Sequence, residues 1–355
     1  MAMGFGIFGA CLLGFLLILC CAGEFIITWD DMKVDTTQSD EGLELKVEGS
    51  SNRSRIIVVD PSGGGDALTV QSAVDMVDDD NSMRVKIYIL PGIYREKVYI
   101  PANKPLISLI GEEDRSEETI ITWSDKASDR DENGDELGTY RSASVTVESD
   151  YFCATAITFE NSVVAVPGEY GMQGVALRIA GDKAMFYRVR VLGTQDTLLD
   201  DTGSHYFYQS YIQGAVDFIF GRATSLYQDC VIRSTAKRYG AIAAHHRDSP
   251  YENTGFSFLN CRIYGSGTIY LGRAWGSYSR VIFSYCEIDS IVNPLGWSDW
   301  NDPSRQKTVV FGEYQCRGIG ADRQNRVSWS RSLSYDDARP FLDTNFIEGD
   351  QWLRL

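Results

Sequence analysis

Short segments of alternating apolar and polar residues repeat along the chain from about Arg55 onward, separated by turns rich in Gly, Asn and Asp. Such segments predict short β-strands, because successive side chains of a strand point to opposite faces. Amphipathic helical patterns are nearly absent, except at residues 69–77, where apolar side chains share one helical face. The pattern predicts one all-β domain over residues 55–355 with a short helix near its beginning.

Five of these segments resemble one another and recur at irregular intervals of about 20 to 31 residues. Their closing apolar residues are Val191, Ile212, Ile232, Ile263 and Ile288. Repeats of this size, each with one or more strands, are typical of a solenoid. We therefore expect a right-handed parallel β-helix of single-stranded coils, with groove-forming loops and the helix at 69–77 capping its N-terminal end.

Small or medium side chains stand two residues before each closing position, which predicts a column of equivalent inward sites. They are Val189, Ser210, Cys230, Cys261 and Cys286. A buried stack of free thiols is favoured over a disulfide, because free Cys packs as a small hydrophobe. Pairing of aligned neighbours stays open. With Cys153 and Cys316 the chain has five cysteines after residue 21, so they cannot all pair internally.

Two aspartates follow two of the closing residues at the same distance. Asp196 lies five residues after Val191, and Asp217 lies five residues after Ile212. If each segment is one coil, the two carboxylates are vertical neighbours, and adjacent strands lie about 4.8 Å apart. Like charges this close raise the pKa of one group, so the pair could supply both an acid and a nucleophile. The spacing predicts a catalytic dyad.

Other side chains converge on this dyad. Gln195 precedes Asp196, and Gln173 lies about one coil earlier, so two amides could stabilise a developing oxyanion without neutralising the carboxylates. Arg273 offers a permanent positive charge, and Trp275 offers a flat apolar face suited to a sugar ring. The loops at 125–136 and 293–305 are expected to form walls of the groove.

Some polar residues near the dyad have simpler explanations. Asp200 and Asp201 are interpreted as turn formers, because a lone Asp after a strand usually has that function. No role is assigned to the three histidines, and the neighbours His245 and His246 should point to opposite faces of a strand. Phe220 could belong to the core or line the groove.

The first 54 residues differ from the rest. Residues 3–22 carry no charged side chain, which favours a cleaved secretory signal peptide over residues 1–23 rather than a retained membrane anchor. Residues 24–54 form a polar N-terminal arm with a glycosylation sequon at Asn52, and the segment from Asp31 to Arg55 is interpreted as mobile. We therefore expect secretion to the extracellular space or cell wall.

Charge and ligand chemistry exclude two classes of partner. The net charge is −16, which argues against nucleic acid, because phosphate binding needs clustered Lys and Arg. It does not argue against an anionic polysaccharide, since a local basic residue can hold a carboxylate. The five later cysteines lack zinc-ligand spacing and the chain has three His, so no metal is expected.

The motifs together resemble the five signature motifs of the pectin methylesterase (pectinesterase) family, in order and spacing. They are GIYRE at 92–96, QGVAL at 173–177, QDTL at 195–198, DFIFG at 217–221 and LGRAW at 271–275. The resemblance extends from about Ile56 to Leu353 and is similar to plant-type members without the inhibitor-like pro-region. Gly174 replaces the usual Ala and Ala274 the usual Pro. The second departure could loosen the turn that carries Arg273 and Trp275, which bears on substrate preference rather than chemistry.

The resemblance implies hydrolysis of methyl esters of galacturonosyl units in pectin (homogalacturonan), releasing methanol during cell wall modification. Asp217 would attack the ester carbonyl. Asp196 would donate a proton to methanol and then activate water. Gln173 and Gln195 would hold the oxyanion, and Arg273 would pair with Asp217.

The resemblance also implies substrate contacts by Thr139, Gln173, Arg273, Trp275 and Phe220, with no cofactor and no metal. Methyl-esterified pectin would be the partner, a proteinaceous pectinesterase inhibitor a further one, and the chain would be a monomer. Two alternatives remain open: a pectin-cleaving lyase or polygalacturonase on the same architecture, and an inactive wall-binding protein.

Overall fold

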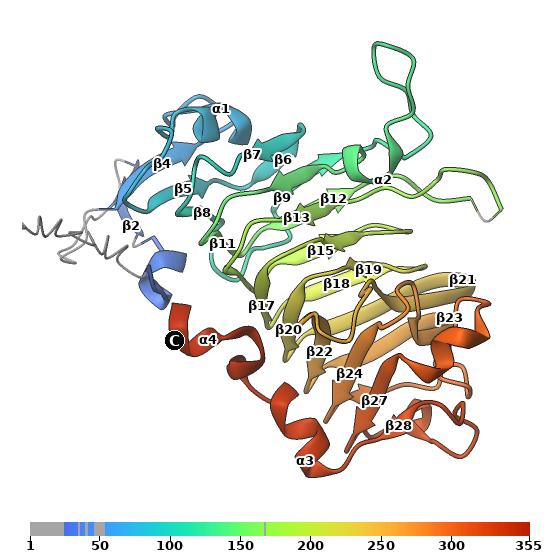
Figure 1. Ribbon diagram of the computed structural model, residues 1–355. Coiled ribbons are helices and arrows are strands. Elements are labelled where there is room, and N and C mark those ends of the chain that lie inside the picture. Colours follow the sequence, from blue (N-terminus) through green and yellow to red (C-terminus); the bar gives the residue numbers. More distant parts are fainter. Residues whose placement is uncertain (1–24, 35, 40–41, 46–53, 167) are drawn as a thin grey trace, which may run out of the picture.

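The computed structural model describes residues 25–34, 36–39, 42–45, 54–166 and 168–355. In this part the chain winds into stacked coils, and a typical coil passes once through each of three parallel β faces (Figure 1). This confirms the predicted parallel β-helix. The predicted signal peptide at 1–23 and the sequon at Asn52 lie outside the described residues.

The first face is a separate sheet of 11 strands. In stacking order its strands are β4 (Arg55–Val59), β5 (Val85–Ile89), β8 (Ile107–Ile110), β11 (Cys153–Thr155), β14 (Ala184–Tyr187), β17 (Ser204–Tyr208), β20 (Thr224–Gln228), β22 (Gly255–Leu259), β24 (Arg280–Ser284), β27 (Val310–Tyr314) and β28 (Arg331–Ser332).

The second and third faces form one sheet of 14 strands, because β21 (Val231–His245) and β23 (Arg262–Arg273) run from one face into the other. The second face also contains β6 (Gly92–Arg95), β9 (Thr119–Trp123), β12 (Thr158–Asn161), β15 (Arg190–Leu192), β18 (Tyr211–Gly214) and β25 (Glu287–Ile288). The third contains β7 (Val98–Ile100), β10 (Val145–Val147), β13 (Leu177–Ile179), β16 (Leu198–Asp200), β19 (Ile219–Gly221) and β26 (Trp297–Ser298).

The strand register confirms the repeat read from the sequence. The closing residues pair in succession along the second face: Val191 with Ile212, Ile212 with Ile232, Ile232 with Ile263, and Ile263 with Ile288. All five side chains are buried in the interior of the coils. The irregular sequence intervals therefore reflect loops of different length between strands that remain in register.

The inward column is also confirmed. Its side chains are at most 1% exposed, and the thiols of Cys230, Cys261 and Cys286 are free. Each thiol donates to a backbone carbonyl of the preceding coil, as Cys261 Sγ does to Tyr227 O at 3.2 Å. The thiols thus have backbone acceptors, with neighbouring thiols of the column beside them, which supports a packing function.

A helix caps the N-terminal end of the stack, as predicted. Helix α1 (Val70–Asp75) begins after Thr69, whose side chain accepts from the Ser72 amide. The carboxylate of Glu96 accepts from the Val70 and Gln71 amides at 2.8 and 2.9 Å. Negative charge at a helix N-terminus is stabilising, so the GIYRE motif contributes structure here.

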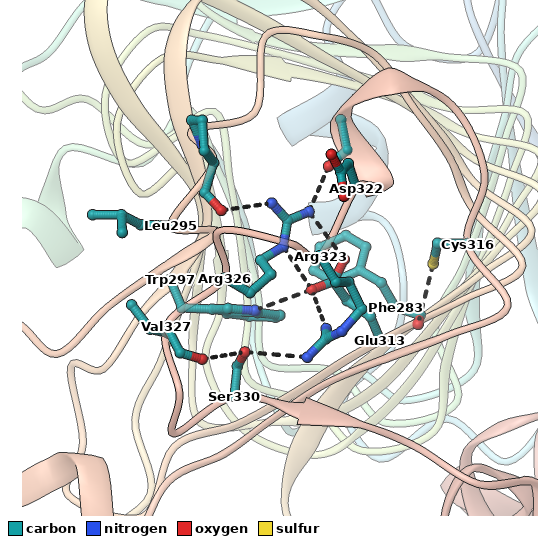
Figure 2. A network of polar contacts seen from close by, with 12 residues as sticks. Phe283, Leu295, Trp297, Glu313, Cys316, Asp322, Arg323, Arg326, Val327 and Ser330 are labelled. Atoms are coloured by element: carbon teal, nitrogen blue, oxygen red, sulfur yellow. Dashed lines mark hydrogen bonds and ion pairs between the residues drawn. The ribbon is translucent and has the colours of Figure 1, made fainter.

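A buried ionic network closes the C-terminal end (Figure 2). Glu313, on β27, is 3% exposed and binds two arginines from the segment that follows it. Arg326 donates from Nε and Nη2 to its two carboxylate oxygens at 2.9 and 3.1 Å, and Arg323 donates at 2.6 Å. Trp297 Nε1 also points to Glu313, at 3.4 Å. The network ties the helix η3 region (Ile319–Ala321) to the last coil.

The first described segment meets the C-terminal end on the outer side of the first face, where the C-terminal segment runs back along the stack (Figure 1). Strand β1 (Ile27–Thr28) pairs with β29 (Leu353–Arg354). The C-terminal segment contains α3 (Tyr335–Ala338), η4 (Arg339–Phe341), η5 (Thr344–Ile347) and α4 (Gly349–Trp352). In the part of the chain that is described, no helix has the length and apolar character needed to cross a membrane.

The beginning of the predicted mobile arm is instead packed. Ile27 and Met32, in and beside helix η1 (Trp29–Met32), are buried, and Asp31 pairs with the buried Arg84 at 3.1 Å. These two apolar residues stand in an otherwise polar stretch without a regular hydrophobic period. Their burial results from tertiary contacts, which the sequence pattern does not indicate. Further along the arm, β2 (Thr36–Ser39) and β3 (Gly42–Leu45) form an antiparallel pair.

Candidate active site

The two aspartates of the predicted dyad stand in register on adjacent coils. Gln195 forms a parallel bridge with Val216, and the Asp196 amide donates to Val216 O at 3.1 Å. Just beyond, Leu198 of β16 pairs with Ile219 of β19. The same offset of 21 residues therefore places Asp196 beside Asp217, as the sequence predicts.

Both aspartates also share an unusual backbone conformation. Their φ angles are 59° for Asp196 and 47° for Asp217, in the left-handed region. Asp tolerates this region better than most residues. Equal backbone conformations at equal coil positions direct the two side chains the same way, into one cavity of about 290 Å³. The cavity is lined by Thr139, Tyr140, Gln195, Asp196, Asp217, Phe220, Ala244, Arg273, Trp275 and Trp300.

Arg273 reaches Asp217 from two coils away. Along the third face Phe220 pairs with Ala244, and Ala244 pairs with Arg273. The short side chain of Ala244 leaves room for the Arg273 side chain to extend back across it. Arg273 Nε donates to Asp217 Oδ1 at 2.8 Å, and its Nη2 contacts the other carboxylate oxygen. The guanidinium carbon also lies 3.9 Å from the ring centre of Trp300, which holds the fork in place.

The two carboxyl groups differ in their electrostatic surroundings. Burial, followed by the charge of Asp217, raises the pKa of Asp196 well above its usual value, and Arg273 opposes this only in part. Burial also raises the pKa of Asp217, but hydrogen bonds and charge from Arg273 oppose it directly. On titration Asp217 therefore loses its proton first, and Asp196 retains one.

An aromatic wall stands beside the dyad. Trp275 lies 6.1 Å from Phe220 between ring centres, and the His246 ring packs edge-on against Trp275 at 4.6 Å. Arg305, in helix η2 (Pro303–Lys307), donates to the Trp275 carbonyl at 2.8 Å. Phe220 is 5% exposed yet lines the cavity, so it belongs to both the core and the site.

The two predicted amides are not equivalent. Gln195 lines the cavity, whereas Gln173 is not among the lining residues. Gln173 Nε2 instead donates to Thr139 Oγ1 at 3.2 Å, and Thr139 belongs to helix α2 (Gly138–Arg141). The predicted wall at 125–136 does not line the cavity; α2, immediately after it, does.

Two interpretations of nearby polar residues were wrong. Asp200 is fully buried and binds His205 Nδ1 and the Tyr227 hydroxyl, each at 2.5 Å, so it is not a surface turn former. Asp201 is 6% exposed and accepts from Arg178 at 2.9 Å. Turn chemistry explains an isolated Asp, but it gives no information on partners from neighbouring coils.

The sequence analysis also missed three lining residues: Tyr140, Ala244 and Trp300. Trp300 lies within the predicted wall at 293–305, which contains two tryptophans, Trp297 and Trp300. An aromatic residue in a groove wall is a sequence signal that could have identified it. Tyr140 adjoins Thr139. Ala244 could not be recognised from its chemistry, because it contributes to the site only by being small.

The geometry supports acid–base and nucleophilic chemistry. One carboxylate is oriented by a cation, the other retains a proton, and an amide lies beside them; these are the parts needed to attack a carbonyl and protonate its leaving group. Over the described ranges, no three His, Cys, Asp or Glu side chains gather to form a metal site.

Comparison with known proteins agrees with this geometry. The family model for pectinesterases matches residues 56–350. The chain is 63% identical over 342 residues to pectinesterase QRT1 of Arabidopsis thaliana, covering 93% of this chain and 90% of that protein. It is 44% identical over 303 residues to putative pectinesterase 11 of the same plant, covering 84% of this chain and 81% of that one.

Among solved structures, a pectin methylesterase from carrot superposes with a TM-score of 0.77 at 34% identity, covering 86% of this chain and 96% of that one. The pectin methylesterase from Aspergillus niger gives 0.73 at 28% identity, with coverage of 86% and 98%. Fold, motif order and family match agree over almost the whole β-helix. The chain belongs to the pectinesterase family.

Proposed function

We propose that this chain hydrolyses methyl esters of galacturonosyl units in pectin, releasing methanol and leaving free carboxylates. The observation that carries the proposal is the aligned pair Asp196 and Asp217, of which only Asp217 is bound by Arg273. Two equivalent carboxylates would compete for one role. Unequal surroundings instead assign them different roles within one cavity.

In the first half of the reaction, the Asp217 carboxylate attacks the ester carbonyl carbon and forms a tetrahedral intermediate. Its oxyanion accepts from the Gln195 amide. Gln173 has one Nε2 hydrogen engaged with Thr139 and a second one left for the same oxyanion. Collapse breaks the carbon–methoxy bond, and the proton on Asp196 passes to the leaving methoxy oxygen. Methanol departs, and Asp217 carries the galacturonyl group as an anhydride.

In the second half, Asp196 is ionised and accepts a proton from water. The resulting hydroxide attacks the acyl carbon, and the bond to Asp217 breaks. The products are a galacturonic acid unit, which then loses its proton to solvent, and the original Asp217 carboxylate, with the proton again on Asp196. Arg273 keeps Asp217 oriented through both steps, and the Trp275 face packs on the sugar ring.

Several further properties belong to this proposal. Residues 55–355 act as one catalytic domain, and the chain is secreted to the cell wall after removal of residues 1–23. It works as a monomer and is a target for proteinaceous pectinesterase inhibitors, which would close the cavity. The support is the plant relatives named above, together with the charge-free stretch at 3–22.

Incubation with highly methylated pectin tests the proposed function. We expect methanol release in step with new carboxylate groups, at constant polymer length. New reducing ends would indicate a polygalacturonase, and unsaturated ends would indicate a lyase; either result without methanol would refute the proposal. No product at all would favour an inactive wall-binding protein.

A further inference from the structure

A second polar cavity lies away from the dyad, beside the first face of the β-helix. It has a volume of about 470 Å³, within the usual range for small-ligand sites. Its lining includes four cationic side chains, Arg247, Arg280, Lys307 and Arg331, and a single carboxylate, Asp337. Such a concentration of positive charge is unexpected in a chain with a net charge of −16.

The two inner arginines, Arg247 buried and Arg280 half-buried, donate to neutral partners. Arg247 is 5% exposed and donates to the carbonyls of Glu252, Pro250 and Tyr278 at 2.6 to 3.3 Å. Arg280 Nε donates to the Thr254 carbonyl at 2.7 Å. Burial and the charge of Arg247 lower the pKa of Arg280 to about 10. Both guanidinium groups therefore remain charged at neutral pH and repel each other.

Within the described residues, carboxylates act on this cluster through longer-range charge alone, Glu252 on Arg247 and Asp337 on Arg331. None of the four cations makes an ion pair within 4 Å there. Asp337 at the rim is engaged by its own helix cap, accepting from Ser334 Oγ at 2.7 Å. Elsewhere in the same chain, buried arginines such as Arg84 and Arg326 are bound to carboxylates. An anion that entered this cavity would supply the missing charge.

The rest of the lining fits a sugar acid better than a bare ion. Tyr278 and Phe341 add aromatic rings to the lining of the same cavity, and the Arg280 guanidinium lies over the Phe341 ring, 5.6 Å from its centre. Planar guanidinium forks match carboxylates, and four cations can hold more than one of them. The acidic chain repels a polyuronate at long range, because both are negatively charged. A local cluster of cations is therefore needed to hold a polyuronate on its surface.

The cavity also adjoins the catalytic site through one short element. Helix η2 ends at Lys307, which lines the cationic cavity, while Arg305 of the same helix binds the Trp275 carbonyl. Tyr278 lies three residues after Trp275, and its amide donates to the Arg247 carbonyl at 2.9 Å. A polymer chain in the catalytic cavity would therefore have the cationic cavity within reach beyond the Trp275 wall.

We propose that this cavity is a second, non-catalytic binding site for de-esterified galacturonan, which we call the uronate site and which is lined by Arg247, Arg280, Lys307 and Arg331. The inference rests on the proposed function, whose product is a polymer with free carboxylates. It adds a place where that product binds outside the catalytic cavity, and it assigns the unpaired cations a ligand.

The test uses the full chain with Lys307→Gln and Arg331→Gln together. Both residues are exposed at the rim, so the inner Arg247 and Arg280 stay intact and folding should be preserved. Calorimetric titration with de-esterified trigalacturonate should show binding to the uronate site about tenfold weaker or more in this variant. The matched control, Arg55→Gln with Arg95→Gln, removes two exposed cations at the N-terminal end and should bind as the unmodified chain does.

Three results would overturn the uronate site. One is equal trigalacturonate binding by all three proteins. Another is binding of inorganic phosphate, but not of trigalacturonate, by the unmodified chain, which would indicate a different ligand class. The third is a parallel loss of methanol release from fully methylated trigalacturonate, whose ester units carry no carboxylate, because the rim would then act on the catalytic site. Failure of the proposed function is separate, since the unmodified chain would then release no methanol.

Discussion

Carboxylates and arginines meet in two buried clusters of this chain, in opposite proportions. In the catalytic cavity two carboxyl groups, Asp196 and Asp217, share the single guanidinium of Arg273. At the C-terminal end the single carboxylate of Glu313 receives two guanidinium groups, from Arg323 and Arg326 (Figure 2). Both clusters combine carboxyl and guanidinium groups, Asp with Arg in one and Glu with Arg in the other, and the ratio of the two groups is reversed.

The ratio determines what each cluster can do. Where carboxyl groups are in excess, one of them retains a proton, and that proton can move during a reaction. Where each oxygen of a carboxylate has a cationic donor, the charges are fixed and the cluster joins segments of chain instead. The catalytic cavity has the first arrangement, which suits chemistry. The Glu313 cluster has the second arrangement, which suits closure of the last coil.

Replacement of Asp217 by Asn should have the largest effect. The amide removes the nucleophile and the partner of Arg273, so kcat should fall by about four orders of magnitude, as when other covalent nucleophiles are removed. Methanol release measures the loss, and circular dichroism checks the fold. Asp229→Asn is the matched control, because Asp229 also has a left-handed backbone, at a φ of 55°, but does not line the cavity. Near-normal turnover in Asp217→Asn would refute the nucleophile.

The same change from carboxylate to amide at Glu313 should act on stability. Glu313→Gln leaves two guanidinium groups without their counter-charge, and breaking a buried pair in this way costs about 3–5 kcal/mol. Denaturant unfolding measures the loss, while the pH profile of kcat/KM should keep its position. Glu287→Gln, at an exposed pair with Arg317, should cost less than about 1 kcal/mol. Equal losses at both positions would remove the distinction between the clusters.

Replacement of Asp196 by Asn should have a smaller and opposite effect on stability. In the native state the pKa of Asp196 is raised, so above about pH 4 the unfolded chain releases a proton that the native chain keeps. The wild type therefore loses stability as pH rises from about 4 through the native pKa. Asp196→Asn removes this loss and should be more stable than the wild type at pH 7, by a margin that grows as the pH rises above about 4. Melting temperatures should converge near pH 4; a difference independent of pH would contradict the account.

The register of the coils could be predicted from the sequence, and the position of the dyad followed from that register. The closing residues, such as Val191 and Ile212, mark the same strand position in successive coils, and a constant five-residue step from them leads to Asp196 and Asp217. This worked because stacked parallel strands convert an equal sequence offset into vertical alignment.

Contacts between more distant coils could not be derived in the same way. The reach of Arg273 to Asp217 depends on a small residue, Ala244, in the coil between them, and the intervening loops break the period. Asp200 binds His205, five residues later on the next strand, and Tyr227, one coil further on, and both partners lie on the first face. Local turn chemistry was a valid argument there, but tertiary packing outweighed it.

The central claim is that Asp196 carries the proton while Asp217 is ionised, and carboxyl titration tests it most directly. Carbon-13 NMR of chains labelled at the Asp carboxyl groups would follow the wild type, Asp196→Asn and Asp217→Asn across pH. The account predicts that the dyad's high-pKa signal disappears in Asp196→Asn. In Asp217→Asn it should remain but move to lower pH, because the neighbouring negative charge is lost. Disappearance of that signal in Asp217→Asn, with retention in Asp196→Asn, would reverse the assigned roles and contradict the account.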